Sequence, residues 1–475
     1  MNDRFYRFGR ALLDQTIRLY YRRIEVVGRE RIPPTGPAIV VANHPNSSTD
    51  AFLLASQLTH RKINFIARDS IPRHPLYGWL VRRFGVVGVA RGIDYERQRD
   101  LSHQRNQLAI ATCVPRLLAG EVVAIFGEGI STDARQLQMI RKGALRFGYA
   151  AEKAADFKLG LAWIPVGISY TAKQRFRSDV LIAVGEPFHL ADLHTSPTAH
   201  ENEVLQRGTQ RLQRDLESLL VNIKREDLAG LIDRLVDLLG GRRGSLVGRV
   251  ERHQHVARTV QYFNMAEPQR LAQVERALRQ YERRLAAAGL SDEVVRQRHP
   301  GLAFWTSFLG IFKNGLLMVL NLYGWANSFV PRWAAYLCRP LGRRSPKTSE
   351  HPEAGEKVLV AQEALWGVLG GWLGAALAFP LQTYLVFRWL TSRLGIGAGL
   401  GLALLYGISL IPSWQLYIHR RDIFRQHILN LSAALRFLIR ACPAIRLQSQ
   451  RRKLQRQLRS LLAAYDVAAP RSPAF

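Results

Sequence analysis

The chain has 475 residues, enough for two or three domains, and 47% of them are hydrophobic. It carries 67 Lys and Arg against 37 Asp and Glu, which gives a formal net charge of +30. The hydrophobic fraction excludes a disordered basic tail protein. The charge predicts an acidic partner, such as anionic lipid, nucleic acid or a phosphate-rich ligand.

Residues 1–23 predict an amphipathic basic helix, because Phe5, Phe8 and Leu12 recur among arginines. No uninterrupted apolar stretch is present there, so we expect no cleaved signal peptide. The helix either lies on an anionic membrane or packs on its own domain. The three cysteines lie far apart in sequence and form no paired or metal-spaced motif, which predicts reduced thiols in a cytosol-facing protein.

Residues 24–200 predict an α/β domain. Short β-branched runs alternate with helical stretches, which is typical of a largely parallel or mixed sheet flanked by helices. We expect strands at Ile24–Val27, Ala38–Ala42, Lys62–Ala67, Val86–Ala90, Val122–Phe126, Leu161–Ile168 and Val180–Val184. We expect helices at Ala51–Leu58, Leu76–Arg83, Leu101–Ala119 and Lys142–Ala155.

Residues 201–300 change to a helix-only pattern, in which leucines recur at helical spacing. An apolar segment follows at residues 301–335, with Lys313 and Asn314 near its middle. A central lysine is costly in lipid. We therefore expect this segment to be interfacial or re-entrant.

Residues 364–418 predict a transmembrane helical hairpin. Ala364–Phe387 and Leu394–Ile418 carry no charge, and each exceeds the roughly 20 residues that span a bilayer. Arg388 and Arg393 mark the short connection. Basic flanks on both sides place the flanks and the α/β domain in the cytoplasm, at the inner membrane of a bacterium. A pair of buried core helices is the alternative interpretation.

Residues 345–356, with two prolines and a glycine, predict a linker before the hairpin. Residues 419–475 predict a basic helical tail, in which Asp422 is the only acid up to Arg459. Such a surface suits anionic lipid headgroups. No nucleic-acid motif accompanies the charge, so we expect no nucleic-acid partner.

The strongest functional signal lies at the end of the second predicted strand. The apolar run Ala38–Ala42 is followed by Asn43 and His44, and a polar loop then leads to Asp50 at the start of an apolar stretch. Open α/β sheets usually place their chemistry at such strand-to-helix junctions. A histidine held by an aspartate can accept a proton from a hydroxyl group near neutral pH. His44 and Asp50 are therefore the candidate catalytic pair.

Three further strand ends carry candidate binding residues. Arg91 follows one strand, and its guanidinium can hold a phosphate. Glu128 stands between two glycines that let the backbone approach a ligand closely, with Gly129 and Ser131 following. Pro165 stiffens an apolar wall. Each signal is weak alone, but their order on the alternating pattern is far more specific.

In these blocks the chain resembles the glycerolipid acyltransferase superfamily, which contains glycerol-3-phosphate and lysophosphatidate acyltransferases. The resemblance runs from about Tyr20 to Pro187. It implies that family's α/β fold and a membrane-associated O-acyltransferase. The matching motif blocks are Asn43-His44 with Asp50, Arg91, Phe126-Gly127-Glu128-Gly129 and Ile164-Pro165-Val166-Gly167.

Two features depart from the family's common pattern. The gap between His44 and Asp50 is one residue longer than usual, and we expect the loop to bulge before the helix starts. This longer form resembles the branch that acts on glycerol-3-phosphate or dihydroxyacetone phosphate. Gly127 replaces the usual proline, which we expect to loosen the loop that carries Glu128.

The resemblance also implies roles. His44 acts as general base on an acceptor hydroxyl, Asp50 orients its imidazole, and the oxygen attacks an acyl thioester directly. Backbone N–H groups after Gly127 or near Asp50 are candidate oxyanion donors. The implied substrate-binding residues are Asn43, Arg91, Glu128, Gly129, Ser131 and Pro165.

The resulting hypothesis is an O-acyltransferase of phospholipid biosynthesis. Its donor is acyl-CoA or acyl-acyl carrier protein, and its acceptor is glycerol-3-phosphate or dihydroxyacetone phosphate. The alternative acceptor is 1-acylglycerol-3-phosphate (lysophosphatidate). We expect an anionic phospholipid membrane as partner and no metal or redox cofactor. The sequence does not specify the oligomeric state.

Two hypotheses from other classes compete with this one. The first is a non-catalytic basic protein that binds membranes or nucleic acid through its charge. The second is a lipid hydrolase with Ser47 or Ser48 as nucleophile, although loop and helix-cap roles suit these serines better. His253 and His255 suggest a metal site, but a solvated helix face is the preferred interpretation.

Overall fold

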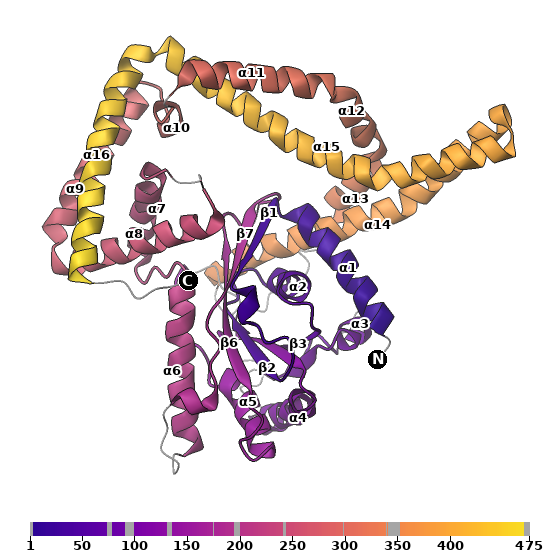
Figure 1. Ribbon diagram of the computed structural model, residues 1–475, viewed down its shortest axis with the longest axis vertical. Helices are drawn as coiled ribbons and strands as arrows, with labels where there is room; N and C mark the ends of the chain where they lie inside the picture. The colour runs from indigo at the N-terminus through magenta and orange to yellow at the C-terminus, as the bar shows by residue number, and fades with distance from the viewer. Residues whose placement is uncertain are drawn as a thin grey trace.

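The computed structural model describes residues 3–73, 78–90, 99–130, 135–173, 175–193, 200–240, 244–297, 299–338, 340 and 352–469. Arg91, Ser131 and residues 345–351 of the predicted linker lie outside these ranges. The described chain forms an α/β domain, a helical bundle and a long helical hairpin (Figure 1).

A seven-stranded sheet forms the centre of the α/β domain. Its strands are β1 (Arg23–Val27), β2 (Ala38–Ala42), β3 (Ile63–Arg68), β4 (Val87–Val89), β5 (Val122–Phe126), β6 (Ala162–Tyr170) and β7 (Asp179–Val184). They lie in the order β1-β7-β6-β2-β5-β3-β4. All neighbours pair in parallel except β6 and β7, which are antiparallel. The sheet is therefore mixed, and the predicted fold class is confirmed.

Helices cover both faces of this sheet (Figure 1). They are α1 (Asp3–Tyr20), α2 (Ser48–Gln57), α3 (Gly78–Arg83), α4 (Arg99–Leu118), α5 (Gly143–Ala154) and α6 (Glu201–Leu219). Successive strand residues point to opposite faces. In β2, Ile39 and Val41 pack towards α4, α5 and α6, whereas Val40 packs towards α1 and α2. Coverage on both faces explains why this strand is apolar throughout.

The N-terminal helix α1 packs on its own domain. Tyr6, Ile17 and Tyr20 are buried, and α1 lies against α2. Arg10 donates a hydrogen bond to the carbonyl of His60 at 2.8 Å. The opposite face carries Phe8, which is 70% exposed. The helix therefore packs on its own domain, which is one of the two interpretations of this segment.

A second hydrophobic core lies in the helical bundle. The bundle contains α7 (Ala229–Leu238), α8 (Leu246–Ala266), α9 (Pro268–Ala287), α10 (Asp292–Val295) and α16 (Ala441–Ala468). Leu447, Leu454 and Leu458 of α16 are buried against α8 and α9. Parts of the predicted regions 201–300 and 419–475, which the sequence divides, thus share one core, whereas α6 packs on the sheet. The leucine stripe of α16 is the reason, although arginines surround it.

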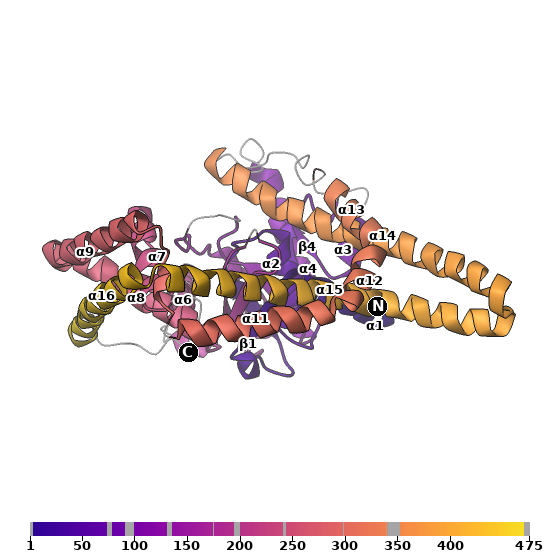
Figure 2. The same ribbon diagram turned by 90° about the horizontal axis from the view of Figure 1, so that it is seen from above.

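The apolar segments form five helices, α11 (Pro300–Leu316), α12 (Met318–Asn327), α13 (Phe329–Cys338), α14 (Pro352–Leu394) and α15 (Ile396–Ile439). α14 and α15 pack as an antiparallel hairpin that turns at Gly395, whose φ of +81° suits glycine. The tip of this hairpin extends away from the rest of the molecule in both views (Figures 1 and 2). Within the described ranges, α15 is the one helix long and apolar enough to cross a membrane.

The hairpin boundaries differ from their predictions. Pro352–Glu356, predicted as part of the linker, begins α14, because proline is tolerated in the first turn of a helix. Arg388 and Arg393 lie within α14 and not in the connection. The second helix continues past Ile418 into the basic region, so no break separates the predicted hairpin from the predicted tail.

Asp179 joins three parts of the fold at the start of β7. It accepts hydrogen bonds from Arg22, just before β1, at 2.9 and 2.8 Å, and from Arg249 of α8 at 2.9 Å. Burial alone would raise the pKa of Asp179, but the hydrogen bonds from the two arginines outweigh it and hold the pKa below its usual value. These bonds connect the helical bundle to the sheet.

We expect Asp179→Asn to lower the free energy of unfolding by about 3 kcal/mol at neutral pH, because Arg249 loses its buried partner. A carboxyl group with a lowered folded pKa stabilises the fold above its unfolded pKa, and this contribution is lost as the pH falls through the folded pKa. The difference between variant and wild type should therefore shrink below about pH 4. Urea unfolding at neutral and acid pH measures both effects.

Asp227→Asn is the matched control, because its ion pair with Arg225 lies at the surface. Exposed pairs contribute little to stability, so this variant should unfold like wild type. Equal stability of wild type and Asp179→Asn at neutral pH would contradict the prediction.

Candidate active site

His44 and Asp50 meet at the carboxyl end of β2. The strand ends at Ala42, α2 begins at Ser48, and the turn between them carries the histidine. His44 Nδ1 lies 2.9 Å from Asp50 Oδ2. A carboxylate at this nitrogen favours the tautomer with the proton on Nδ1, which leaves Nε2 as the basic nitrogen. The structure thus brings the predicted catalytic pair into direct contact.

The Asp50 carboxylate is fully buried and has partners on both oxygens. Besides its contact with His44, Oδ2 accepts the backbone N–H of Asn46 at 2.7 Å. Oδ1 accepts the hydroxyl of Tyr170 at 2.5 Å. Burying an unpartnered carboxylate costs several kcal/mol, and these donors offset that cost. Asp50 also lies in the first turn of α2, where the helix dipole favours negative charge.

The longer gap between His44 and Asp50 is accommodated at Ser47. This residue has φ +50° and ψ −139°, outside the usual regions for a non-glycine residue. The turn closes with a hydrogen bond of 3.0 Å from the N–H of Asp50 to the carbonyl of Ser47. The expected bulge before the helix is confirmed, and the extra residue does not separate the pair.

The imidazole ring of His44 stacks on Phe126, the last residue of β5. The ring centroids lie 3.9 Å apart, and the ring planes differ by 13°. The His44 side chain is 18% exposed, so a small part of the ring reaches the surface. The stack fixes the plane of the ring, and the contact with Asp50 fixes its rotation within that plane. Together they set the direction of Nε2.

Glu128 holds the histidine turn in place. It is 4% exposed, and its two oxygens accept the backbone N–H groups of His44 at 2.8 Å and Gln138 at 3.0 Å. Burial raises the pKa of Glu128, and the two hydrogen bonds oppose this effect. The resemblance implies a substrate contact for Glu128, whereas both of its oxygens here bind backbone.

The side chain of Asn43, the residue that follows β2, binds the backbone of β6. Its side-chain amide donates to the carbonyl of Ile168 at 3.1 Å and accepts the N–H of Ile168 at 2.7 Å. The buried amide thereby links the start of the histidine turn to β6. The resemblance implies substrate binding by Asn43, whereas its amide here binds backbone and orients the histidine turn.

Pro165 lies inside β6, which continues to Tyr170, and not at a strand end as expected. β6 pairs with β7 from Val166 onward, and the register has shifted where Trp163 meets Phe188. Proline is tolerated at such a bulge because no ladder hydrogen bond needs its missing N–H. The bulge between β6 and β7 therefore explains the position of Pro165 without a contact to substrate.

Gly127 does not loosen its loop. Its N–H donates to the carbonyl of Ala42 at 2.9 Å, a hydrogen bond that proline could not make. A Cβ atom at this position would lie 2.8 Å from Ile140 Cδ1. The expected loosening of the loop is therefore wrong. The N–H groups of Gly129 and Asp50, which were candidate oxyanion donors, are already bound to backbone carbonyl groups.

Tyr170 is the main supporting residue that the sequence does not reveal. It ends β6, which lies directly beside β2 in the sheet. Burial, and then the charge of Asp50, raise the pKa of Tyr170, so its hydroxyl stays protonated and donates. A second such residue is Lys173, whose Nζ donates to the carbonyl of Pro45 at 2.9 Å. Tyr170 and Lys173 could be found only from the adjacency of β2 and β6, which the fold provides and the sequence does not.

Arg91 and Ser131, which the resemblance assigns to the acceptor, lie outside the described residues. The strand before Arg91, β4, belongs to the parallel set that includes β2, β3 and β5. Its carboxyl end therefore lies on the same edge of the sheet as the end of β2. The histidines of the suggested metal site face different carboxylates: His253 lies 3.2 Å from Asp233, and His255 lies 3.1 Å from Asp466.

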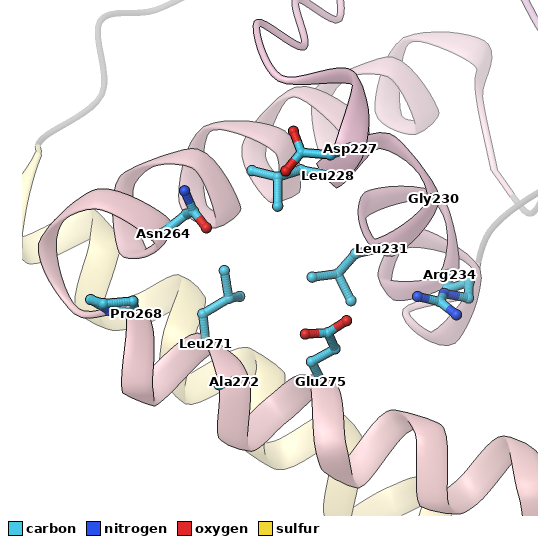
Figure 3. A pocket seen from close by; sticks show the side chains of 10 residues that line it. All are labelled: Asp227, Leu228, Gly230, Leu231, Arg234, Asn264, Pro268, Leu271, Ala272 and Glu275. Atoms are coloured by element: carbon cyan, nitrogen blue, oxygen red, sulfur yellow. The ribbon is translucent and has the colours of Figure 1, made fainter.

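A hollow of about 250 Å³ lies between α7, α8 and α9 (Figure 3). Leucines line it together with Asp227, Arg234 and Glu275. It belongs to the helical bundle, and none of the predicted site residues is part of its lining.

Residues 23–169 match the family model described as Acyltransferase. This segment contains β1 to β5, most of β6 and the His44–Asp50 pair. This segment is therefore similar to acyltransferase domains, which supports the resemblance to the glycerolipid acyltransferase superfamily that the motif blocks carry.

Proteins similar to the chain include two curated enzymes of the same name. The lyso-ornithine lipid O-acyltransferase of Rhizobium meliloti (strain 1021) is 32% identical over 136 residues, which cover 28% of this chain and 41% of that protein. The protein of the same name from Brucella abortus (strain 2308) is 27% identical over 154 residues, which cover 32% and 52%. The chain thus spans at most 52% of the length of these relatives.

A solved structure similar to the chain is the 1-acyl-sn-glycerophosphate (LPA) acyltransferase PlsC from Thermotoga maritima. Its similarity has a TM-score of 0.33 at 20% sequence identity and covers 46% of this chain and 83% of that chain.

We expect Glu128→Gln to lower kcat and to leave the KM of the acceptor unchanged, because Glu128 binds backbone. An amide offers one oxygen, so one of the two N–H groups loses its acceptor, at a cost of about 1–3 kcal/mol. Steady-state kinetics and thermal unfolding measure the two effects. An increase in acceptor KM with unchanged kcat would instead indicate a direct substrate contact. Glu186→Gln is a suitable control, because Glu186 is exposed and pairs with Arg31.

We expect Tyr170→Phe to lower kcat about 10-fold, because Asp50 loses a charge-assisted hydrogen bond of about 1.5 kcal/mol. Without that donor the carboxylate interacts more strongly with the imidazolium, so the rising limb of the pH–rate profile should move to higher pH. Tyr149→Phe, which alters a tyrosine of α5 that contacts Phe157, should leave the profile unchanged. A Tyr170→Phe profile that matches wild type would contradict the assigned role.

Proposed function

We propose that this protein is an O-acyltransferase of lipid biosynthesis, which transfers a fatty acyl group from a thioester to an acceptor hydroxyl. The observation that carries the proposal is the contact between His44 and the buried Asp50 at the carboxyl end of β2. The match of residues 23–169 to the Acyltransferase family model supports the reaction class.

The proposed reaction uses His44 as general base. Nε2 takes the hydroxyl proton while the acceptor oxygen attacks the thioester carbonyl carbon. The new C–O bond forms, the C–S bond breaks, and its electron pair leaves with sulfur. The imidazolium then gives the proton to the departing thiolate, which regenerates the neutral histidine. Asp50 stabilises the imidazolium, and no acyl-enzyme is needed.

The donor in this proposal is acyl-CoA or acyl-acyl carrier protein. Both are acidic and suit a chain of formal net charge +30. The proposed acceptor is glycerol-3-phosphate or dihydroxyacetone phosphate, which the longer gap between His44 and Asp50 supports. A lysolipid acceptor is the second candidate, and the names of the two curated relatives favour it.

We further propose an anionic bilayer as partner, with the α/β domain on its cytoplasmic side at the bacterial inner membrane. The tip of the α14–α15 hairpin exposes many apolar side chains, as a surface in lipid would. They include Leu381, Tyr384, Leu385, Trp389, Leu394, Ile396, Leu400, Leu402, Leu404, Leu405 and Ile408. Arg420, Arg421 and Arg425 follow on α15, where they would meet anionic headgroups.

We expect His44→Ala to lower acyl transfer by about 10²–10⁴-fold, because a general base contributes on that order. The assay supplies labelled acyl-CoA to the detergent-solubilised protein together with glycerol-3-phosphate, dihydroxyacetone phosphate, lysophosphatidate or lyso-ornithine lipid. His253→Ala should retain wild-type activity, because this histidine lies in the helical bundle. Unchanged transfer by His44→Ala would refute the mechanism, and the panel identifies the acceptor.

Two further measurements on the purified protein would favour the competing hypotheses of a hydrolase or a non-catalytic protein. An acyl group on Ser47 or Ser48, detected by mass spectrometry after exposure to the donor, would indicate a hydrolase. RNA that co-purifies with a steep dependence on salt, together with no transfer to any acceptor, would indicate a non-catalytic basic protein.

A further inference from the structure

The loop between β6 and β7 contacts the catalytic turn at its first end. It begins directly after Tyr170, whose hydroxyl donates to Asp50 at 2.5 Å. Three residues later, Lys173 Nζ donates to the carbonyl of Pro45, the residue that follows His44, at 2.9 Å. Any displacement of this loop would therefore act on the two sides of the His44–Asp50 contact.

The same loop contacts the α14–α15 hairpin at its other end. Phe176, together with Leu19 of α1, packs against a buried hairpin cluster that includes Phe379 and Trp414. Arg177 Nε donates to Asp422 Oδ2 of α15 at 2.8 Å, and the two side chains are 13% and 23% exposed. Together these interactions form the docking contact between the β6–β7 loop and the hairpin.

Charge distribution singles out Asp422. It is the only acid between Ile418 and Arg459, a stretch rich in arginine and lysine. An isolated acid there has a specific partner in Arg177, which belongs to a distant part of the chain. Because both side chains are largely removed from water, loss of Asp422 leaves the partly buried Arg177 without its carboxylate partner. Loss of Arg177 leaves Asp422 with only the longer contact to Arg421 at 3.4 Å.

The backbone of Arg177 is also unusual. Its φ is +63°, which a non-glycine residue adopts only at a cost of about 1–3 kcal/mol. Such residues persist where the surroundings over-determine them. Here the N–H of Arg177 donates to the carbonyl of Tyr20 at 2.8 Å, while its side chain binds Asp422. The strained residue stands at the point where the loop meets the hairpin.

The length of the hairpin gives the docking contact a position relative to a bilayer. From Ile396 at the tip to Trp414 at the docking contact, α15 rises about 27 Å at about 1.5 Å per residue. The hydrocarbon core of a bilayer is about 30 Å thick. A hairpin whose tip is inserted to that depth would hold the β6–β7 loop, and with it His44, at the membrane surface.

We propose that Arg177 and Asp422 are positioning residues, through which the docked hairpin holds the β6–β7 loop and thereby the His44–Asp50 pair. Acyl transfer then depends on the attachment of the hairpin to the α/β domain. This inference rests on the proposed function of the site. It extends that function to two residues more than 100 positions away from the catalytic pair, and to the contact between the α/β domain and the hairpin.

The test is a charge exchange in the full-length protein, reconstituted in vesicles of phosphatidylglycerol and phosphatidylethanolamine. Arg177→Asp and Asp422→Arg should each lower kcat at least 10-fold and leave the KM of donor and acceptor within about 2-fold. The double variant with both changes should recover activity to within about 3-fold of wild type. Aspartate tolerates a positive φ better than most residues, so the exchange adds little strain at position 177.

Arg175→Ala is the matched control, because Arg175 is an exposed arginine of the same loop. It should behave like wild type. Single variants with wild-type kcat would overturn the proposal. So would a double variant as inactive as the single ones.

Hydrogen exchange provides a readout that does not depend on activity. In Asp422→Arg, the amides of residues 44–50 and 175–178 should exchange faster than in wild type, and the double variant should restore their protection. Equal exchange in all variants would overturn the proposal even if folding defects lower their activity. If wild type shows no acyl transfer but the exchange pattern appears, the proposed function fails and the docking inference stands.

Discussion

The buried carboxylate of Asp50 is the interaction on which the rest of the site depends. Its two oxygens contact the imidazole of His44, the N–H of Asn46 and the hydroxyl of Tyr170, which come from two different parts of the chain. A charge at this depth is tolerable only with such partners. Its cost therefore requires β6 to lie beside β2 and the histidine turn to bulge at Ser47. Loss of any donor would leave a buried oxygen of Asp50 short of a partner, which costs free energy.

The sheet makes this burial possible. β2 is the central strand and has apolar helices on both faces, so the residue that follows it emerges at the middle of the edge and not at a corner. Parallel strands bring their carboxyl ends to that same edge, which is why Phe126 of β5 can stack on His44. Glu128 then fixes the backbone of the histidine turn by accepting the N–H of His44. Packing of hydrophobic side chains thus determines where the polar groups meet.

Local sequence predicted most elements and the proximity of His44 and Asp50, because both depend on short-range patterns. The strand Ala38–Ala42 and the nearby Asp50 lie within one strand–turn–helix unit, so their proximity follows from the chain itself. Tyr170 was not predictable in this way, because its contact with Asp50 needs the strand order. The role of Glu128 differed for a similar reason: a Gly-Glu-Gly sequence does not show which backbone groups will face the carboxylate. In α16, the many arginines concealed a leucine stripe that completes the core of the bundle.

Three acids of this strongly basic chain stand where its parts join. Asp179 connects the sheet to α8, Asp422 connects the hairpin to the β6–β7 loop, and Asp292 binds Arg451 of α16 at 2.8 Å. The planar guanidinium of arginine matches a carboxylate in direction as well as charge, so such pairs fix geometry better than apolar contacts alone. With arginine in excess, each such acid determines which arginine turns inward. The remaining arginines keep the positive charge of the surface, which the proposed anionic membrane and acidic acyl donor would both require.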